Sequence, residues 1–222
     1  MENKLPSYVE LLLERWLNLC CEIETLPKPA HFLGDVMKPR FNEAKATQAA
    51  ALLLKKRGGR MSYMKLIKLL YLVDRTALIR WGRPVTFDSY FSLQHGPVLS
   101  RTLDLITEGE APDEPSIWST CISEPQNYEI ALKGECSTDE LSQAEEDLIG
   151  EIFDQYGRMN RWQLVGRLHD ELPEWQNPQG SSLPIEYRDI LLAGGKTSRE
   201  IAEIEAEIEG LALFDDLALA AA

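Results

Sequence analysis

The sequence predicts a mainly helical α+β protein, a compact multi-helix domain around a central apolar helix, with a small antiparallel β element. Apolar residues recur at helical spacing along most of the 222-residue chain, and the segment 64–81 is apolar on nearly every side. The alternating segment 128–132 instead favours a strand. A hydrophobic content of 44% and a charged content of 27% are typical of globular domains.

Residues 1–36 form a separate unit in this prediction. Their first part carries apolar residues at helical spacing, and Pro27 and Pro29 then favour an extended linker before Met37. We expect an N-terminal extension over 1–36, with an over-called start codon as one hypothesis. The main domain is predicted over 37–195, and a C-terminal helix with a frayed tail over 196–222.

Two helices are predicted between positions 42 and 81. Asn42 is a favoured capping residue for a helix that ends at Gly58-Gly59, and Ser62 precedes the central helix. Its polar face is expected to expose Lys65, Lys68 and Arg75. Asp74 falls on the apolar side, where an unpaired carboxylate is costly, so we infer a Tyr, His, Arg or backbone N–H partner.

The remaining elements follow from shorter signals. Residues 87–93 predict an extended segment, and Pro97 is predicted at the first position of a helix over 98–106. Capping patterns predict three more helices, beginning after Ser142, Asn160 and Thr197, with the last continuing through Leu211. A further short helix is predicted over 187–193.

The charge is unevenly distributed along the chain. Residues 38–83 hold twelve basic and two acidic side chains, whereas residues 84–222 hold eight basic and 28 acidic ones, and the net charge is −13. A basic segment in an acidic protein is compatible with nucleic-acid binding. Packing of the two oppositely charged parts against each other is the favoured alternative, because overall acidity repels phosphate. We do not expect nucleic acid as a partner.

No pattern for catalysis is present. The three histidines form no i, i+4 pair, and the glycine-rich nucleotide and hydrolase motifs are missing from the sequence. His95 could meet Asp74 and form a general base, but a hydrogen-bonded interior pair is favoured. We therefore predict no enzyme and no catalytic, cofactor-binding or metal-binding residue.

The cysteines and hydropathy bear on location. None of the four cysteines lies in a Cys-x-x-Cys pair, which favours a reducing compartment, and no segment is long and apolar enough to span a membrane. A cytoplasmic protein without a membrane partner is expected. A helix-turn-helix over 42–81 is an alternative, but its second helix lacks the polar face that reads bases.

Several motifs resemble a known family. Lys65-Leu66-Ile67-Lys68-Leu69-Leu70-Tyr71, then Asp74 and a His95-Gly96-Pro97-Val98 turn, resemble the Panacea domain of the SocA-like antitoxins. Leu172-Pro173-Glu174-Trp175 adds to the likeness, which covers about 41–175.

The resemblance implies an antitoxin, often encoded beside phage-related genes, that neutralises a cognate toxin by direct protein contact. A protease adaptor that promotes toxin degradation, as SocA is, and a DNA-binding regulator are the alternatives. The resemblance implies no catalytic residue or cofactor. We expect the motif residues to act as scaffold, namely Lys65, Leu66, Lys68, Leu69, Leu70, Tyr71, Asp74, His95, Gly96, Pro97, Val98, Pro173, Glu174 and Trp175. Partner contacts are expected at Lys65, Lys68, Arg75 and Trp81, with exposed tryptophans as anchors.

Overall fold

The computed structural model describes residues 39–108 and 116–220, which form eight helices and five short strands. The helices are α2 (Glu43–Lys56), α3 (Tyr63–Trp81), α4 (Ser100–Thr107), α5 (Ile117–Cys121), α6 (Gln143–Tyr156), α7 (Arg161–Glu171), α8 (Tyr187–Ala193) and α9 (Ser198–Ala220). The strands are β1 (Arg60–Ser62), β2 (Tyr90–Leu93), β3 (Gly96–Leu99), β4 (Glu129–Ala131) and β5 (Leu183–Ile185). The predicted fold class is confirmed. The predicted extension over 1–36 lies outside the described residues, and the division at 36 and 195 stays a prediction.

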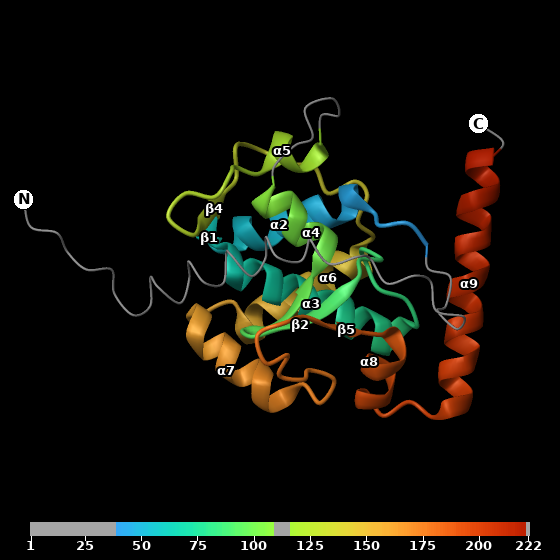
Figure 1. Cartoon of the computed structure of the whole chain (residues 1–222). Coiled ribbons are helices and arrows are strands. Elements are labelled where there is room, and N and C mark those ends of the chain that lie inside the picture. Colours follow the sequence, from blue (N-terminus) through green and yellow to red (C-terminus); the bar gives the residue numbers. More distant parts are fainter. Residues whose placement is uncertain (1–38, 109–115, 221–222) are drawn as a thin grey trace, which may run out of the picture.

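Helix α3 is the centre of the molecule, as predicted. Fourteen of its 19 residues are buried, and it packs against α2, α6, α7, α8 and strand β3 (Figure 1). A helix that is apolar on nearly every side is stable only when neighbours cover it on several sides. It ends at Gly82, whose φ of 73° is the left-handed conformation that glycine adopts without strain.

The predicted caps explain where four of the eight described helices begin. The side chain of Asn42 accepts a hydrogen bond from the backbone N–H of Lys45 at 2.9 Å, and capping boxes open α6 and α7. Thr197 and Glu200 exchange the same bonds at the start of α9. Ser62 precedes α3, but its hydroxyl does not cap the helix, and the first helical N–H, that of Tyr63, donates to the carbonyl of Tyr128.

The strands form two small antiparallel sheets. Strand β1 pairs with β4, so that Met61 faces Ile130, and the second sheet has the order β3-β2-β5. The predicted extended segment over 87–93 contains β2, and the predicted strand over 128–132 contains β4. Strands β1 and β5 have only three residues each, too few for a pattern of alternation to identify them.

The prediction that Pro97 begins a helix is wrong. Pro97 lies in strand β3 opposite Ser92, and α4 begins only at Ser100. The carboxylate of Asp88 sets this start, because it accepts bonds from the backbone N–H groups of Arg101 and Thr102 at 2.9 Å each. A remote aspartate therefore caps α4, which no local sequence pattern reveals.

Ion pairs join the basic segment to the acidic remainder of the chain. Lys45 contacts Glu145 at 2.7 Å, and Arg80 contacts Glu151 at 2.7 Å. The favoured prediction, in which the oppositely charged parts pack against each other, is confirmed at these contacts.

Helices α2 and α3 are separated by strand β1, so the segment 42–81 is not a helix-turn-helix.

A disulfide joins Cys121 at the end of α5 to Cys136 after β4. No disulfide was predicted from the sequence, because the cysteine pattern favoured a reducing compartment. The two residues are 15 positions apart, and the antiparallel pairing of Ile122 with Leu132, with a bond from the N–H of Lys133 to the carbonyl of Cys121, brings them together. Among the described residues, no helix is both long and apolar enough to cross a membrane.

We expect the Cys121–Cys136 bridge to stabilise the fold, because it restricts the unfolded chain. In the chain-entropy model a loop of this length contributes about 3 kcal/mol to the free energy of unfolding. Urea unfolding of the wild type should shift to lower urea when a thiol reductant is added. Cys121→Ser is the control, and a reductant effect of equal size in that variant would contradict the prediction.

Candidate protein-interaction site

Lys65 is buried rather than exposed. Its ammonium group donates to the carbonyl oxygens of Gly157 at 2.6 Å and Met159 at 2.7 Å, in the turn between α6 and α7. Burial, followed by the charge of Arg57, lowers the pKa of Lys65 to about 8. The expectation that Lys65 belongs to an exposed polar face is therefore wrong.

Lys68 is the second lysine that was expected at the surface, and it is 0% exposed. Its ammonium group donates to the carbonyls of Gly96 at 2.9 Å and Pro97 at 2.7 Å. Burying a charge costs little only when hydrogen bonds replace its water. The lysine of α3 and the Gly-Pro turn, which are separate motifs in the sequence, are thus two halves of one contact.

Asp74 has the partners that its burial requires. Its carboxylate accepts bonds from the backbone N–H groups of Val85 and Thr86 at 3.0 Å each, from the hydroxyl of Thr86, and from the hydroxyl of Tyr90 at 3.0 Å. Burial raises the pKa of Asp74 to about 7, although these hydrogen bonds oppose the shift. The inference of a tyrosine or backbone N–H partner is confirmed.

The favoured prediction of a hydrogen-bonded interior pair of His95 and Asp74 is wrong, and so is the alternative of a His95–Asp74 base. His95 packs against Trp162 in an edge-to-face arrangement, with ring centroids 5.4 Å apart, whereas all four bonds to Asp74 come from Val85, Thr86 and Tyr90. Burial, and then the nearby charge of Lys68, lowers the pKa of His95. No hydrogen bond joins the two groups within the described chain, so they cannot act together as a general base.

Glu174 ties the later motif to α3. Its carboxylate accepts bonds from Arg75 Nε at 2.6 Å and from the Tyr71 hydroxyl at 3.0 Å. The neighbouring Trp175 donates from Nε1 to the carbonyl of Leu93 at 3.0 Å and stacks on His169, with centroids 3.8 Å apart. Arg75 was expected as a partner contact. Its guanidinium instead forms an ion pair with Glu174 inside the domain, and its side chain is only partly exposed.

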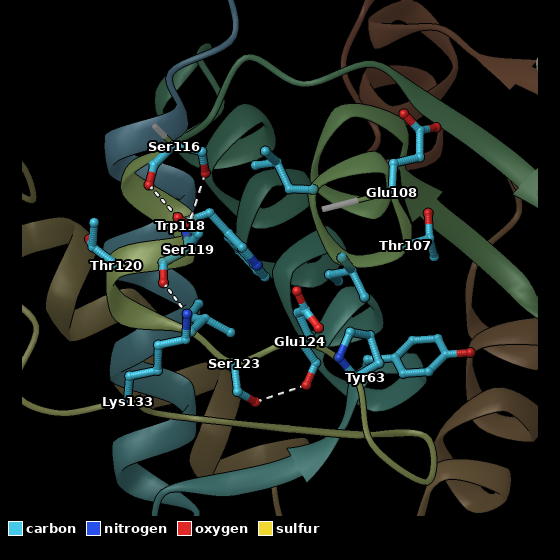
Figure 2. Close-up of a pocket in the computed structure, with 14 residues that line it drawn as sticks. Tyr63, Thr107, Glu108, Ser116, Trp118, Ser119, Thr120, Ser123, Glu124 and Lys133 are labelled. Atoms are coloured by element: carbon cyan, nitrogen blue, oxygen red, sulfur yellow. Dashed lines mark hydrogen bonds between the residues drawn. The ribbon is translucent and has the colours of Figure 1, made fainter. Parts of the chain in front are cut away.

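A hollow of about 760 Å³ is lined by the C-terminal end of α4, by α5 and by the segment that follows α5 (Figure 2). Figure 2 shows Lys133 reaching the main-chain oxygen of Ser119, at 2.6 Å, while the hydroxyls of Ser119 and Ser123 donate to backbone carbonyls. None of the 14 lining residues is a histidine or cysteine. Lys133, the one lysine of the lining, donates to a main-chain oxygen rather than to a serine hydroxyl.

Metal chemistry has no obvious place either. Over residues 39–108 and 116–220, no three potential ligands among His, Cys, Asp and Glu lie close enough to hold one ion.

The strongest remaining surface feature is apolar. The exposed large apolar residues concentrate on α9, at Leu211, Leu213, Phe214 and Leu217.

These residues adjoin a groove of about 720 Å³ at the end of α3. Trp81, which is 39% exposed, lines it together with Gly82 and with Leu211 and Phe214 of α9. Trp81 was predicted as a contact residue and is accessible, whereas Trp118 is buried. The residues on α9 were missed. The sequence pattern could have identified them as exposed, because positions 211, 213, 214 and 217 fall outside the buried stripe of Ile201, Ile208 and Ala212.

The burial of Asp74 predicts a pH dependence. The folded carboxyl titrates near pH 7 and the unfolded one near 3.8, so the folded state holds the extra proton between these values. Raising the pH from 5 to 8 should therefore lower the free energy of unfolding of the wild type, relative to Asp74→Asn, by about 1–4 kcal/mol. Urea unfolding at each pH measures the difference, and a difference independent of pH would contradict the prediction.

The contact of Lys68 predicts a structural defect. Lys68→Met removes the donor to the carbonyls of Gly96 and Pro97, and we expect the free energy of unfolding to fall by about 2 kcal/mol or more. Lys55→Met, at an exposed position near the end of α2, is the matched control and should change it by less than about 0.5 kcal/mol. Equal effects of the two substitutions in urea unfolding would show that Lys68 is not structurally important.

Comparison with known proteins adds the family. The family model described as antitoxin SocA-like, Panacea domain, matches residues 66–176, which is half of the chain. The match begins in α3 and ends just after Trp175, so it contains the contacts of Lys68, Asp74 and Glu174. No curated protein and no solved structure matches the chain. The chain belongs to the SocA-like antitoxin family and carries its Panacea domain.

Proposed function

We propose that the protein is an antitoxin that neutralises a cognate toxin by direct protein–protein contact. Family membership supports an antitoxin role. The observation that carries the contact mechanism is the inward use of the polar motif residues. The hydrogen bonds of three motif residues, Lys65, Lys68 and Asp74, are made to groups inside the domain. Recognition of a partner would therefore fall to side chains on the outer surface.

The proposed mechanism is steric blockade in a stable complex. A net charge of −13 would attract a basic partner and speed the encounter. Exposed aromatic and apolar side chains, such as Trp81 and Phe214, are the type that contributes most of the binding free energy at protein interfaces. Because Lys65 and Lys68 are buried, they are poor candidates for direct contact, and Arg75 contributes at most its exposed edge.

Binding rather than catalysis agrees with the family and with the arrangement of side chains. Direct reading of DNA is disfavoured, because α3 lies in the interior and has no face free for a major groove. We place the protein in the cytoplasm, where its cognate toxin would be made. The Cys121–Cys136 pair would then be reduced or oxidised according to the redox state of the cell.

Co-expression tests the proposal. The product of the neighbouring gene, expressed alone, should stop growth of the host, and co-expression with this protein should restore it. Blockade predicts that the two proteins purify together and that the amount of toxin stays unchanged. A neighbouring product that is harmless alone, or toxic in the presence of this protein, would contradict the antitoxin role.

The same experiment separates blockade from the alternative of a protease adaptor. An adaptor would lower the amount of toxin only in cells with an active protease, and inactivating that protease would restore toxicity. Blockade predicts the same growth with and without the protease. Immunoblotting of the toxin in both hosts measures this difference.

A further inference from the structure

Helix α9 has two apolar surfaces, of which the domain uses one. Ile201, Ile208 and Ala212 face inward and are at most 4% exposed. Leu213, Phe214 and Leu217 face outward, where Phe214 is 73% and Leu217 67% exposed. Figure 1 shows α9 along one side of the molecule, and its contacts run mainly to α8. Its C-terminal half therefore presents a row of apolar side chains that the fold does not need.

The outward row continues into the groove at the end of α3. Phe214 and Leu211 line one wall, and Trp81 with Gly82 forms part of the other. An exposed tryptophan beside an exposed phenylalanine supplies the rigid aromatic surface that protein interfaces favour. We call this surface, formed by Trp81, Leu211, Leu213, Phe214 and Leu217, the α9 face.

Acidic side chains flank the α9 face. In the first half of α9, Glu203 pairs with Arg199 at 2.8 Å and Glu205 with Arg188 at 2.6 Å. Towards the second half, Glu207, Glu209 and Asp215 are exposed and form no ion pair with any residue that the structure describes. Arg83 is the one basic residue among those lining the groove. The unpaired charge beside the apolar row is thus predominantly negative.

This charge discriminates between possible occupants. A second copy of the chain would bring its own Glu207, Glu209 and Asp215 towards the same carboxylates. The chain's own residues 1–37 hold six acidic and only three basic side chains. A basic partner instead offers an opposite charge to each unpaired carboxylate.

From this we propose that the α9 face is the docking surface for the partner, and that the partner contributes a helix with one apolar and one cationic face. The apolar face of that helix would lie on Trp81, Phe214 and Leu217, and its cations would meet Glu207 and Glu209. The assignment of this surface to a toxin rests on the proposed antitoxin function.

A synthetic peptide tests the surface without any toxin. The probe is an 18-residue helical peptide with leucine on one face and lysine on the other, and its control carries glutamate in place of lysine. We expect the full-length protein to bind the lysine peptide and not the glutamate peptide, with affinity that falls as salt rises. Fluorescence anisotropy of a labelled peptide gives the dissociation constants.

Two variants, each with a matched control, locate the binding. Phe214→Glu should weaken the lysine peptide by about tenfold or more, whereas Ile117→Glu, at another exposed apolar position, should leave it within about twofold. Glu207→Lys with Glu209→Lys should weaken binding and flatten its salt dependence, whereas Glu135→Lys should not. Circular dichroism verifies that the variants are folded. Loss of affinity in the controls equal to that in the α9 variants would overturn the proposal.

Co-expression of the same variants then separates this inference from the proposed function. We expect Phe214→Glu to lose neutralisation of the neighbouring gene product while Ile117→Glu retains it. Full neutralisation by Phe214→Glu would overturn the α9 face and leave the antitoxin role intact. If even the wild type fails to neutralise, the antitoxin role fails, and the peptide measurement still decides whether the face takes a cationic helix.

Two further outcomes would assign the face to another occupant. A wild-type dimer in analytical ultracentrifugation that Phe214→Glu converts to a monomer would identify a second copy. An increase of about tenfold in peptide affinity on Trp16→Glu in the full-length chain would identify the chain's own N-terminal segment. Either result would overturn a cationic partner helix, so we expect a monomer and an unchanged affinity.

Discussion

The burial of charged side chains on α3 is the constraint on which the rest of this structure depends. Lys65, Lys68 and Asp74 leave water almost completely, and each would destabilise the fold without partners. Backbone groups from separate segments supply them: the turn after α6, the start of strand β3 at Gly96 and Pro97, and the Val85-Thr86 segment. One helix therefore specifies the path of three remote parts of the chain, because each must arrive with its polar groups in place.

This arrangement explains how a motif that looks like a polar surface belongs to the core. Lysine at helical spacing favours an exposed face, yet Lys65 donates to carbonyls after α6 and Lys68 donates to carbonyls at the start of β3. Tyr71 and Arg75 add Glu174, so that the segment around Trp175 is tied to the same helix. The polar residues of the motif thus determine which segments meet, and the outer surface is free to serve recognition.

Charge separates the two roles along the chain. Four basic residues of the first half form ion pairs with the acidic second half, at Lys45–Glu145, Arg60–Glu129, Arg75–Glu174 and Arg80–Glu151. The acids near the end of α9 have no such partners among the described residues, and they lie beside apolar side chains that the core leaves outside. An acidic and apolar helix at the edge of a rigid domain suits a partner of the opposite charge.

The sequence by itself determined the helical class, the central position of α3 and the capped starts of α2, α6, α7 and α9, because periodicity and caps are local properties. It also identified the family from the Lys-Leu-x-Lys-Leu-Leu-Tyr motif, and it required a partner for Asp74. Only the tertiary structure decided that Lys68 points inward, that Asp88 caps α4 from a distance and that Cys121 meets Cys136. It also decided which side chains of α9 remain exposed. Each of these depends on a contact between residues far apart in the chain, and no local pattern carries that information.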